Sequence, residues 1–129
     1  FNEVSTYIKF RKKPELVKRQ LISILSKFKK QGLKIAGYGA SAKGNTMLQY
    51  CGITRDTLDY IVDNAPSKQG LYTPGTHIRI VAPDYLRKKV PDVVLILAWN
   101  FADSIMEREK WFKEQGGKFV IPIPFPNVI

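Results

Sequence analysis

The sequence predicts an α/β fold of the Rossmann-like type, with three layers and a mainly parallel sheet of about five strands. Short aliphatic runs alternate with amphipathic segments, a pattern typical of a parallel sheet covered by helices on both faces. One run, at residues 92–98, is aliphatic without alternation and so indicates a strand buried on both faces. A glycine-rich segment, residues 34–44, joins a predicted strand directly to a predicted helix.

The N-terminal part predicts an added helix. We expect residues 1–31 to form a helical lead-in packed on the domain and residues 32–129 to form the Rossmann-like domain. Pro14 suits a first helical turn, and Gly32 ends the helical pattern. The apolar stripe at helical spacing consists of Val17, Leu21, Ile24 and Phe28, with Leu16 and Leu25 beside it.

The remaining elements follow in alternation. We expect strands at residues 34–38, 58–62, 78–81, 92–98 and 118–121, and helices at residues 42–50, 83–89 and 102–115. Right-handed crossovers give the strand order 3-2-1-4-5. The turn signals in residues 64–77 predict a long structured loop. The proline-rich tail from Pro122 is not expected to continue a ladder.

Composition narrows the classes of protein. With 129 residues, 44% hydrophobic and 25% charged, the chain fits one globular domain. Its first residue, Phe1, suggests a piece of a longer protein. We expect no membrane contact and a cytoplasmic location, because no run of roughly 18 apolar residues occurs. Cys51 is the single cysteine, so an internal disulfide is excluded, and one cysteine with one histidine almost excludes a zinc site.

The net charge of +10 has two interpretations, a nucleic-acid footprint or a solvated basic helix face. We favour the second, because no aromatic or glycine residues interleave the basic run, and we expect no nucleic-acid partner. Ten of the 21 basic residues fall in the first 34 positions, namely Lys9, Arg11, Lys12, Lys13, Lys18, Arg19, Lys27, Lys29, Lys30 and Lys34.

The candidate site lies where ligands bind in open parallel sheets, beyond the carboxyl ends of the strands at the reversal of strand order. Gly37, Gly39 and Ala42 fit the spacing of a phosphate-binding turn, which brings backbone N–H groups to an anion at a helix N-terminus. The alternative is a turn whose glycines serve only packing. The segment also contributes Tyr38, Ala40, Ser41, Lys43, Gly44, Asn45 and Thr46.

Asp63 lies 24 residues after Gly39, near the separation expected of an acid that binds a ribose hydroxyl. That spacing favours a dinucleotide such as NAD, and an NAD(P)- or CoA-binding module is the alternative function. Asp63 equally suits the start of a turn. Further candidates are donors in the 64–77 loop and two residues after the fourth strand, namely Lys68, Gln69, Tyr72, Thr76, His77, Trp99 and Asn100. Trp99 equally suits a packed edge position. Paired carboxylates and a catalytic triad are missing, so a complete active site is not expected.

Several motifs resemble the C-terminal domain of SAM-dependent nucleotide-sugar C-methyltransferases. They are GYGASAKGNT at 37–46, YCGI at 50–53, DYIVD at 59–63, KQGLYTPGTH at 68–77, VAP at 81–83 and LAWNFAD at 97–103. The similarity runs from about Gly32 to Pro124 and is looser over the N-terminal helix.

The resemblance implies a role in deoxysugar biosynthesis. In that family, a zinc-binding domain and a SAM-binding domain with the catalytic base come before the one seen here. The resemblance therefore implies that this domain binds a nucleotide-sugar, typically a dTDP-linked deoxy-keto sugar, and contacts the upstream methyltransferase domain. It also implies that this domain contributes no catalytic residue, SAM site or zinc ligand. The sequence does not identify the sugar, the ring carbon or the oligomeric state.

Overall fold

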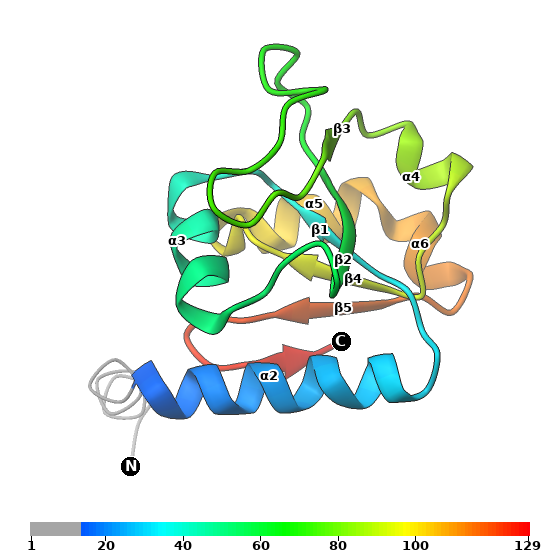
Figure 1. Ribbon diagram of the computed structural model, residues 1–129. Helices are drawn as coiled ribbons and strands as arrows, with labels where there is room; N and C mark the ends of the chain where they lie inside the picture. The colour runs from blue at the N-terminus through cyan, green and yellow to red at the C-terminus, as the bar shows by residue number, and fades with distance from the viewer. Residues whose placement is uncertain (1–13) are drawn as a thin grey trace.

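Six strands form one sheet in the order β3-β2-β1-β4-β5-β6 in the computed structural model, which describes residues 14–129 (Figure 1). The five parallel strands have the predicted order, with β1 and β4 adjacent at the point where the order reverses. The strands are β1 (Ile35–Tyr38), β2 (Leu58–Val62), β3 (Ile80–Val81), β4 (Val93–Ile96), β5 (Lys118–Ile121) and β6 (Asn127–Val128). The predicted Rossmann-like class is therefore confirmed.

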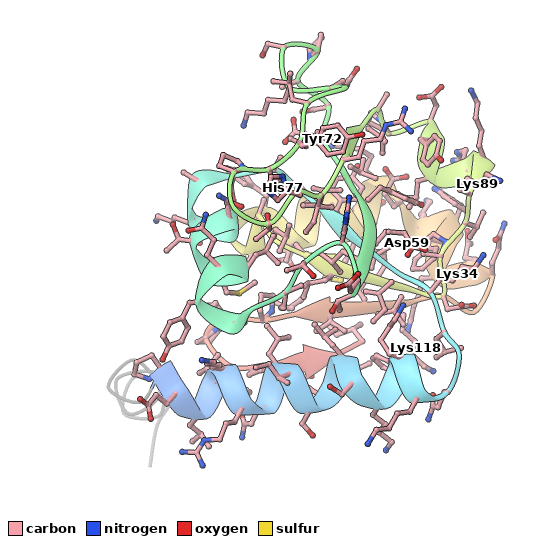
Figure 2. All side chains as sticks on the ribbon, in the orientation of Figure 1. Lys34, Asp59, Tyr72, His77, Lys89 and Lys118 are labelled. Carbon is pink, nitrogen blue, oxygen red and sulfur yellow. The ribbon has the colours of Figure 1, made fainter. Side chains whose placement is uncertain are left out.

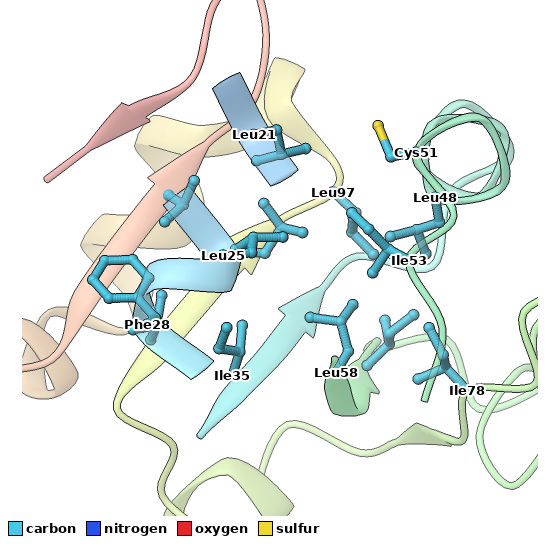
Figure 3. Close-up of a cluster of buried hydrophobic side chains, with 14 residues drawn as sticks. Leu21, Leu25, Phe28, Ile35, Leu48, Cys51, Ile53, Leu58, Ile78 and Leu97 are labelled. Carbon is cyan, nitrogen blue, oxygen red and sulfur yellow. The ribbon is translucent and has the colours of Figure 1, made fainter. Parts of the chain in front are cut away.

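Helices cover both faces of the sheet. One face carries α2 (Pro14–Lys30) and α3 (Ala42–Cys51), whose leucines pack on the sheet in the cluster drawn in Figure 3. The other face carries α4 (Tyr85–Lys88), α5 (Ala102–Arg108) and α6 (Lys110–Glu114), packed in a second cluster around Phe112 and Phe119. The three predicted layers are present.

The buried face of α2 differs slightly from the predicted stripe. Val17, Leu21, Leu25 and Phe28 are buried, whereas Leu16 is 37% exposed. Ile24 is only half-buried. Leu25 therefore belongs to the stripe, because it lies one helical turn from Leu21 on the same face. The first 13 residues of the predicted lead-in lie outside the described residues.

The tail forms a sixth strand that the sequence analysis missed. Pro122, Pro124 and Pro126 all lie between β5 and β6, so the prolines themselves stay out of the ladder. The chain reverses over this segment, and β6 pairs antiparallel with β5. Ile129 and Phe119 exchange backbone hydrogen bonds of 2.8 and 2.9 Å. The expectation that the tail adds no ladder is wrong for its last residues, because they follow the prolines.

The single helix predicted at residues 102–115 is two helices in the structure, α5 and α6. A 3-10 turn, η1 (Trp99–Phe101), precedes α5, and the helix breaks at Glu109, where φ is −107° and ψ is 32°. Glu109 turns its carboxylate into the core, where two aromatic side chains donate hydrogen bonds to it. No helix among residues 14–129 is long and apolar enough to cross a membrane.

Candidate functional site

The turn between β1 and α3, residues 39–41, lies directly against the end of β4. Gly39 has a φ of +94°, and a Cβ placed there would lie 2.6 Å from the Ala98 Cβ. A Cβ on Gly44 would lie 2.8 Å from the Leu97 Cβ. Close packing therefore requires both glycines, as the packing alternative expected. Gly37 is buried within β1, and a Cβ there would lie 3.0 Å from Ile61 Cγ1.

The N-terminus of α3 presents open backbone donors at this turn. Ser41 caps the helix, since its Oγ accepts a 3.0 Å hydrogen bond from Gly44 N. The N–H groups of Ser41, Ala42 and Lys43 have no acceptor among residues 14–129. Such groups carry the positive end of the helix dipole, so the arrangement suits an anion.

Asp63 fixes the turn to the loop that follows β2. Its Oδ2 accepts a 2.8 Å hydrogen bond from Ala40 N, and its Oδ1 accepts one of the same length from Ala65 N. Gln69 Nε2 donates to the Asp63 backbone oxygen at 2.8 Å. Both carboxylate oxygens thus already bind backbone amides, which is the turn role that the sequence allowed.

Lys68 carries a positive charge to the same turn. Its Nζ donates a 3.0 Å hydrogen bond to the Ala40 backbone oxygen. Lys43 lies in the first turn of α3, where its side chain is exposed. The sequence placed these lysines 25 residues apart, and the fold brings both to the edge where α3 begins.

The rest of the 64–77 loop packs on α3. Asn45 Nδ2 donates to Pro74 O at 3.3 Å, and Thr76 Oγ1 donates to Asn45 Oδ1 at 3.3 Å. Thr76 also shares a short hydrogen bond with the Thr73 hydroxyl, and both residues are buried. Thr46 Oγ1 donates to Ala42 O at 3.0 Å within the helix. The hydrogen bonds of Asn45 therefore tie the loop to α3, whereas that of Thr46 stays within the helix.

Tyr72 and His77, unlike Lys68, make no hydrogen bond to the turn within residues 14–129. Tyr72 is 59% exposed and forms an isolated bridge with Arg79, while His77 has a φ of 55° and is exposed (Figure 2). Trp99 and Asn100 follow β4 in η1, immediately after Ala98, which adjoins Gly39. Trp99 is half-buried and Asn100 exposed. Trp99 and Asn100 therefore flank the predicted crevice.

The side chain of Tyr38, another sequence candidate, lies in the apolar core cluster under α5 and α6. It is 4% exposed, and its hydroxyl donates a 2.7 Å hydrogen bond to Glu109 Oε2 on the face covered by α5 and α6. Trp111 Nε1 donates to Glu109 Oε1 at 2.8 Å. The sequence analysis missed Glu109, because an acid within a helical pattern usually indicates an exposed position.

The buried Tyr38 predicts a loss of stability in alkali. Burial raises the pKa of Tyr38 to about 12, and the hydrogen bond to Glu109 adds to the shift. This contribution to stability is fully present below the unfolded pKa of about 10 and is lost as pH rises through about 12. Burial raises the pKa of Tyr60 as well.

We therefore expect the free energy of unfolding, measured in urea, to fall between about pH 10 and about pH 12. The fall should be smaller in Tyr38→Phe. Lysines also titrate in this range, so the difference between wild type and variant isolates the tyrosine. Identical pH profiles would show that Tyr38 does not carry the effect.

No cluster of three or more His, Cys, Asp or Glu suited to a metal ion occurs within residues 14–129. Cys51 is 8% exposed, and burial raises the pKa of its thiol. Cys51 packs in the core cluster on the face covered by α2 and α3.

Two comparisons with known proteins identify the family. The family model described as C-methyltransferase C-terminal domain matches residues 1–124. The C-methyltransferase NovU of Streptomyces niveus is 39% identical over 123 residues, which cover 95% of this chain and 29% of NovU. The chain therefore spans under a third of that relative. On the matched model and on this identity, the chain belongs to the C-methyltransferase C-terminal domain family.

Proposed function

We propose that the turn at residues 39–41 binds the diphosphate of a nucleoside-diphosphate sugar, with dTDP as the nucleotide and a deoxy-keto sugar as the acceptor. The observation that carries this proposal is the set of open N–H groups of Ser41, Ala42 and Lys43 at the N-terminus of α3. An anion at this position would accept several backbone hydrogen bonds and be attracted by the positive end of the helix dipole.

Two lysines supply charge for the same group. Lys68 Nζ lies 3.0 Å from Ala40 O, and Lys43 extends from the first helical turn. Charge-assisted hydrogen bonds of this type are roughly twice as strong as neutral ones. Trp99 and Asn100 flank the crevice, where an indole stacks on a base and an amide binds its edge or the sugar.

We further propose that methyl transfer takes place on an upstream domain that holds SAM, and that this domain orients the acceptor. NovU is a C-methyltransferase, and this chain matches 29% of it. Within residues 14–129, the buried acid Glu109 lies on the other face of the sheet and is engaged by Tyr38 and Trp111. Binding and orientation, rather than proton transfer, are therefore the functions assigned to this domain.

The alternative, an NAD(P)- or CoA-binding module, rests on the glycine spacing and on Asp63. A ribose would have to share the Asp63 carboxylate with the amides of Ala40 and Ala65, each 2.8 Å from one of its oxygens. Because both carboxylate oxygens already accept hydrogen bonds, Asp63 is a poor partner for a ribose hydroxyl. This favours a ligand that binds through its diphosphate instead.

A dTDP titration followed by amide chemical shifts tests the proposal. We expect the largest shifts at Ser41, Ala42 and Lys43. The Lys43→Ala/Lys68→Ala variant should bind at least about tenfold more weakly, because it loses two charged contacts. The matched control Lys27→Ala/Lys113→Ala lies on other surfaces and should bind as the wild type does.

Shifts confined to other parts of the chain, or equal affinities for the two double variants, would contradict the site. NADH that binds more tightly than dTDP, with binding lost in Asp63→Ala, would instead support the alternative.

A further inference from the structure

A groove separates α2 from α3 on the face of the sheet opposite to α5 and α6. It consists of two cavities, of about 400 Å³ and about 300 Å³, and Cys51 lines both of them. The larger lies towards the end of α2 and the turn after α3, and the smaller lies between the start of α2, α3 and Ile123–Pro124. We call the two together the α2–α3 groove.

The floor of the α2–α3 groove is apolar. Leu25 and Ile53 lie at one end, and Leu21 and Met47 at the other. Figure 3 shows Leu21 and Leu25 of α2 across from Cys51 and Ile53. Exposed apolar depressions between two helices typically accept an apolar surface from a partner, often one face of an amphipathic helix.

The rim of the groove is basic. Lys29 and Lys30 line the larger cavity, and Lys18 and Lys43 line the smaller, against one acid, Asp56. Both ion pairs within residues 14–129, Lys88–Asp84 and Lys110–Glu107, lie elsewhere. Lys18 Nζ instead lies 4.9 Å from the centre of the Tyr50 ring, across the groove. Lys43 is already assigned to the proposed diphosphate site, so Lys29 and Lys30 are the rim charges left open to an acidic partner.

The smaller cavity is also where the polypeptide enters the domain. Pro14, the first residue of α2, lines it beside Ile123 and Pro124. A domain that precedes Pro14 in the same polypeptide is tethered at this end of the groove, so its local concentration there is high. The chain matches 29% of NovU, which leaves room for such a domain.

We propose that the α2–α3 groove docks an acidic surface with an apolar centre on the upstream methyltransferase domain of the same polypeptide. This inference rests on the proposed function only in assuming that domain. The segment 1–13 is a poorer occupant by charge, since its four basic residues oppose the rim and it holds one acid, Glu3. Docking there leaves the carboxyl edge at Gly39–Ser41 free to face the same domain.

Zero-length carbodiimide cross-linking of the full-length protein tests the proposal, because it joins a lysine only to a carboxylate in direct contact. We expect Lys29 and Lys30 to cross-link to upstream Asp or Glu residues. We also expect Lys29 and Lys30 to be acetylated at least about fivefold more slowly than Lys113 and Lys118, because ion pairs with the upstream domain would protect them. High salt should remove this difference, since it screens the ion pairs.

The variant Lys29→Gln/Lys30→Gln should lose these cross-links, whereas Lys113→Gln/Lys118→Gln, with the same change in net charge, should keep them. Equal acetylation of all four lysines without upstream cross-links would overturn the proposal. So would cross-links to Glu3, which place segment 1–13 in the groove, or cross-links between molecules that grow with concentration, which indicate a second copy.

Failure of this inference is distinguishable from failure of the proposed function. If the protein does not bind dTDP but cross-links as expected, the proposed nucleotide site is contradicted and the proposed docking at the groove is supported. If it binds dTDP without upstream cross-links, the nucleotide site is supported and the docking is contradicted.

Discussion

Gly39→Ala is expected to destabilise the domain by about 3 kcal/mol, because the new methyl group adds strain and overlap. The φ of +94° places an alanine in the left-handed region, and its Cβ would lie 2.6 Å from the Ala98 Cβ and 3.1 Å from the Ala98 N. Ala98 N lies in the backbone at the end of β4, so relief requires β1 and β4 to move apart. Urea unfolding monitored by fluorescence measures the loss.

Gly52→Ala is the matched control for this substitution. Gly52 ends α3 with a φ of +70°, and nothing lies within 4 Å of the position its Cβ would take. It should therefore show the backbone strain alone, about 1–2 kcal/mol. If Gly39→Ala costs no more than Gly52→Ala, the contact with Ala98 does not constrain the turn. In the folded fraction of Gly39→Ala we also expect weaker dTDP binding, because the N–H groups of α3 shift with the turn.

Strand order was predictable because it follows from handedness and alternation. Each buried aliphatic run pairs with its neighbour through a right-handed crossover, so few arrangements remain. The position of the candidate site was predicted from the same order, since β1 and β4 meet where that order reverses. The sequence therefore predicted where Gly39 and Trp99 lie, without any knowledge of their contacts.

Individual side-chain directions were less predictable. Tyr38 and Gly39 are adjacent in sequence, yet the Tyr38 side chain lies in the core, whereas Gly39 follows the end of β1 and begins the turn, where its φ is +94°. Asp63 had two interpretations, as an acid that binds a ribose hydroxyl or as the start of a turn, and they differ only in which groups donate hydrogen bonds to its carboxylate. Tertiary contacts with Ala40 and Ala65 decide between them, and spacing along the chain contains no information on those contacts.

Elements with few local signals were missed for a similar reason. β6 has only two residues and exists because the chain reverses over residues 122–126 and then lies beside β5. The helix break at Glu109 depends on donors from two places, one on β1 and one two residues away on α6. Neither feature has a periodic sequence pattern. The sequence therefore predicted no strand after Pro122 and one continuous helix at residues 102–115.

Glu109→Ala is expected to destabilise the domain by about 3 kcal/mol, because it leaves a buried donor without an acceptor. Glu109 is 6% exposed and Tyr38 is 4% exposed, so water does not readily replace the carboxylate at the Tyr38 hydroxyl. Trp111 is half-buried, and its Nε1 loses less because solvent is closer. Glu114→Ala, on the exposed side of α6, is the control and should change stability by less than about 0.5 kcal/mol.

The pair Tyr38 and Glu109 can be separated by a double-mutant cycle. Tyr38→Phe alone removes one hydrogen bond to a charged group, about 1.5–3 kcal/mol, and leaves Glu109 with Trp111. In Tyr38→Phe/Glu109→Ala no buried hydroxyl is left without an acceptor. The double variant should therefore lose less free energy of unfolding than the sum of the losses in the two single variants, by about 1 kcal/mol or more. Strict additivity in urea unfolding would mean that Glu109 acts through packing alone. A coupled result would mean that the hydrogen bond between Tyr38 and Glu109 ties the break between α5 and α6 to the end of β1, one residue before Gly39.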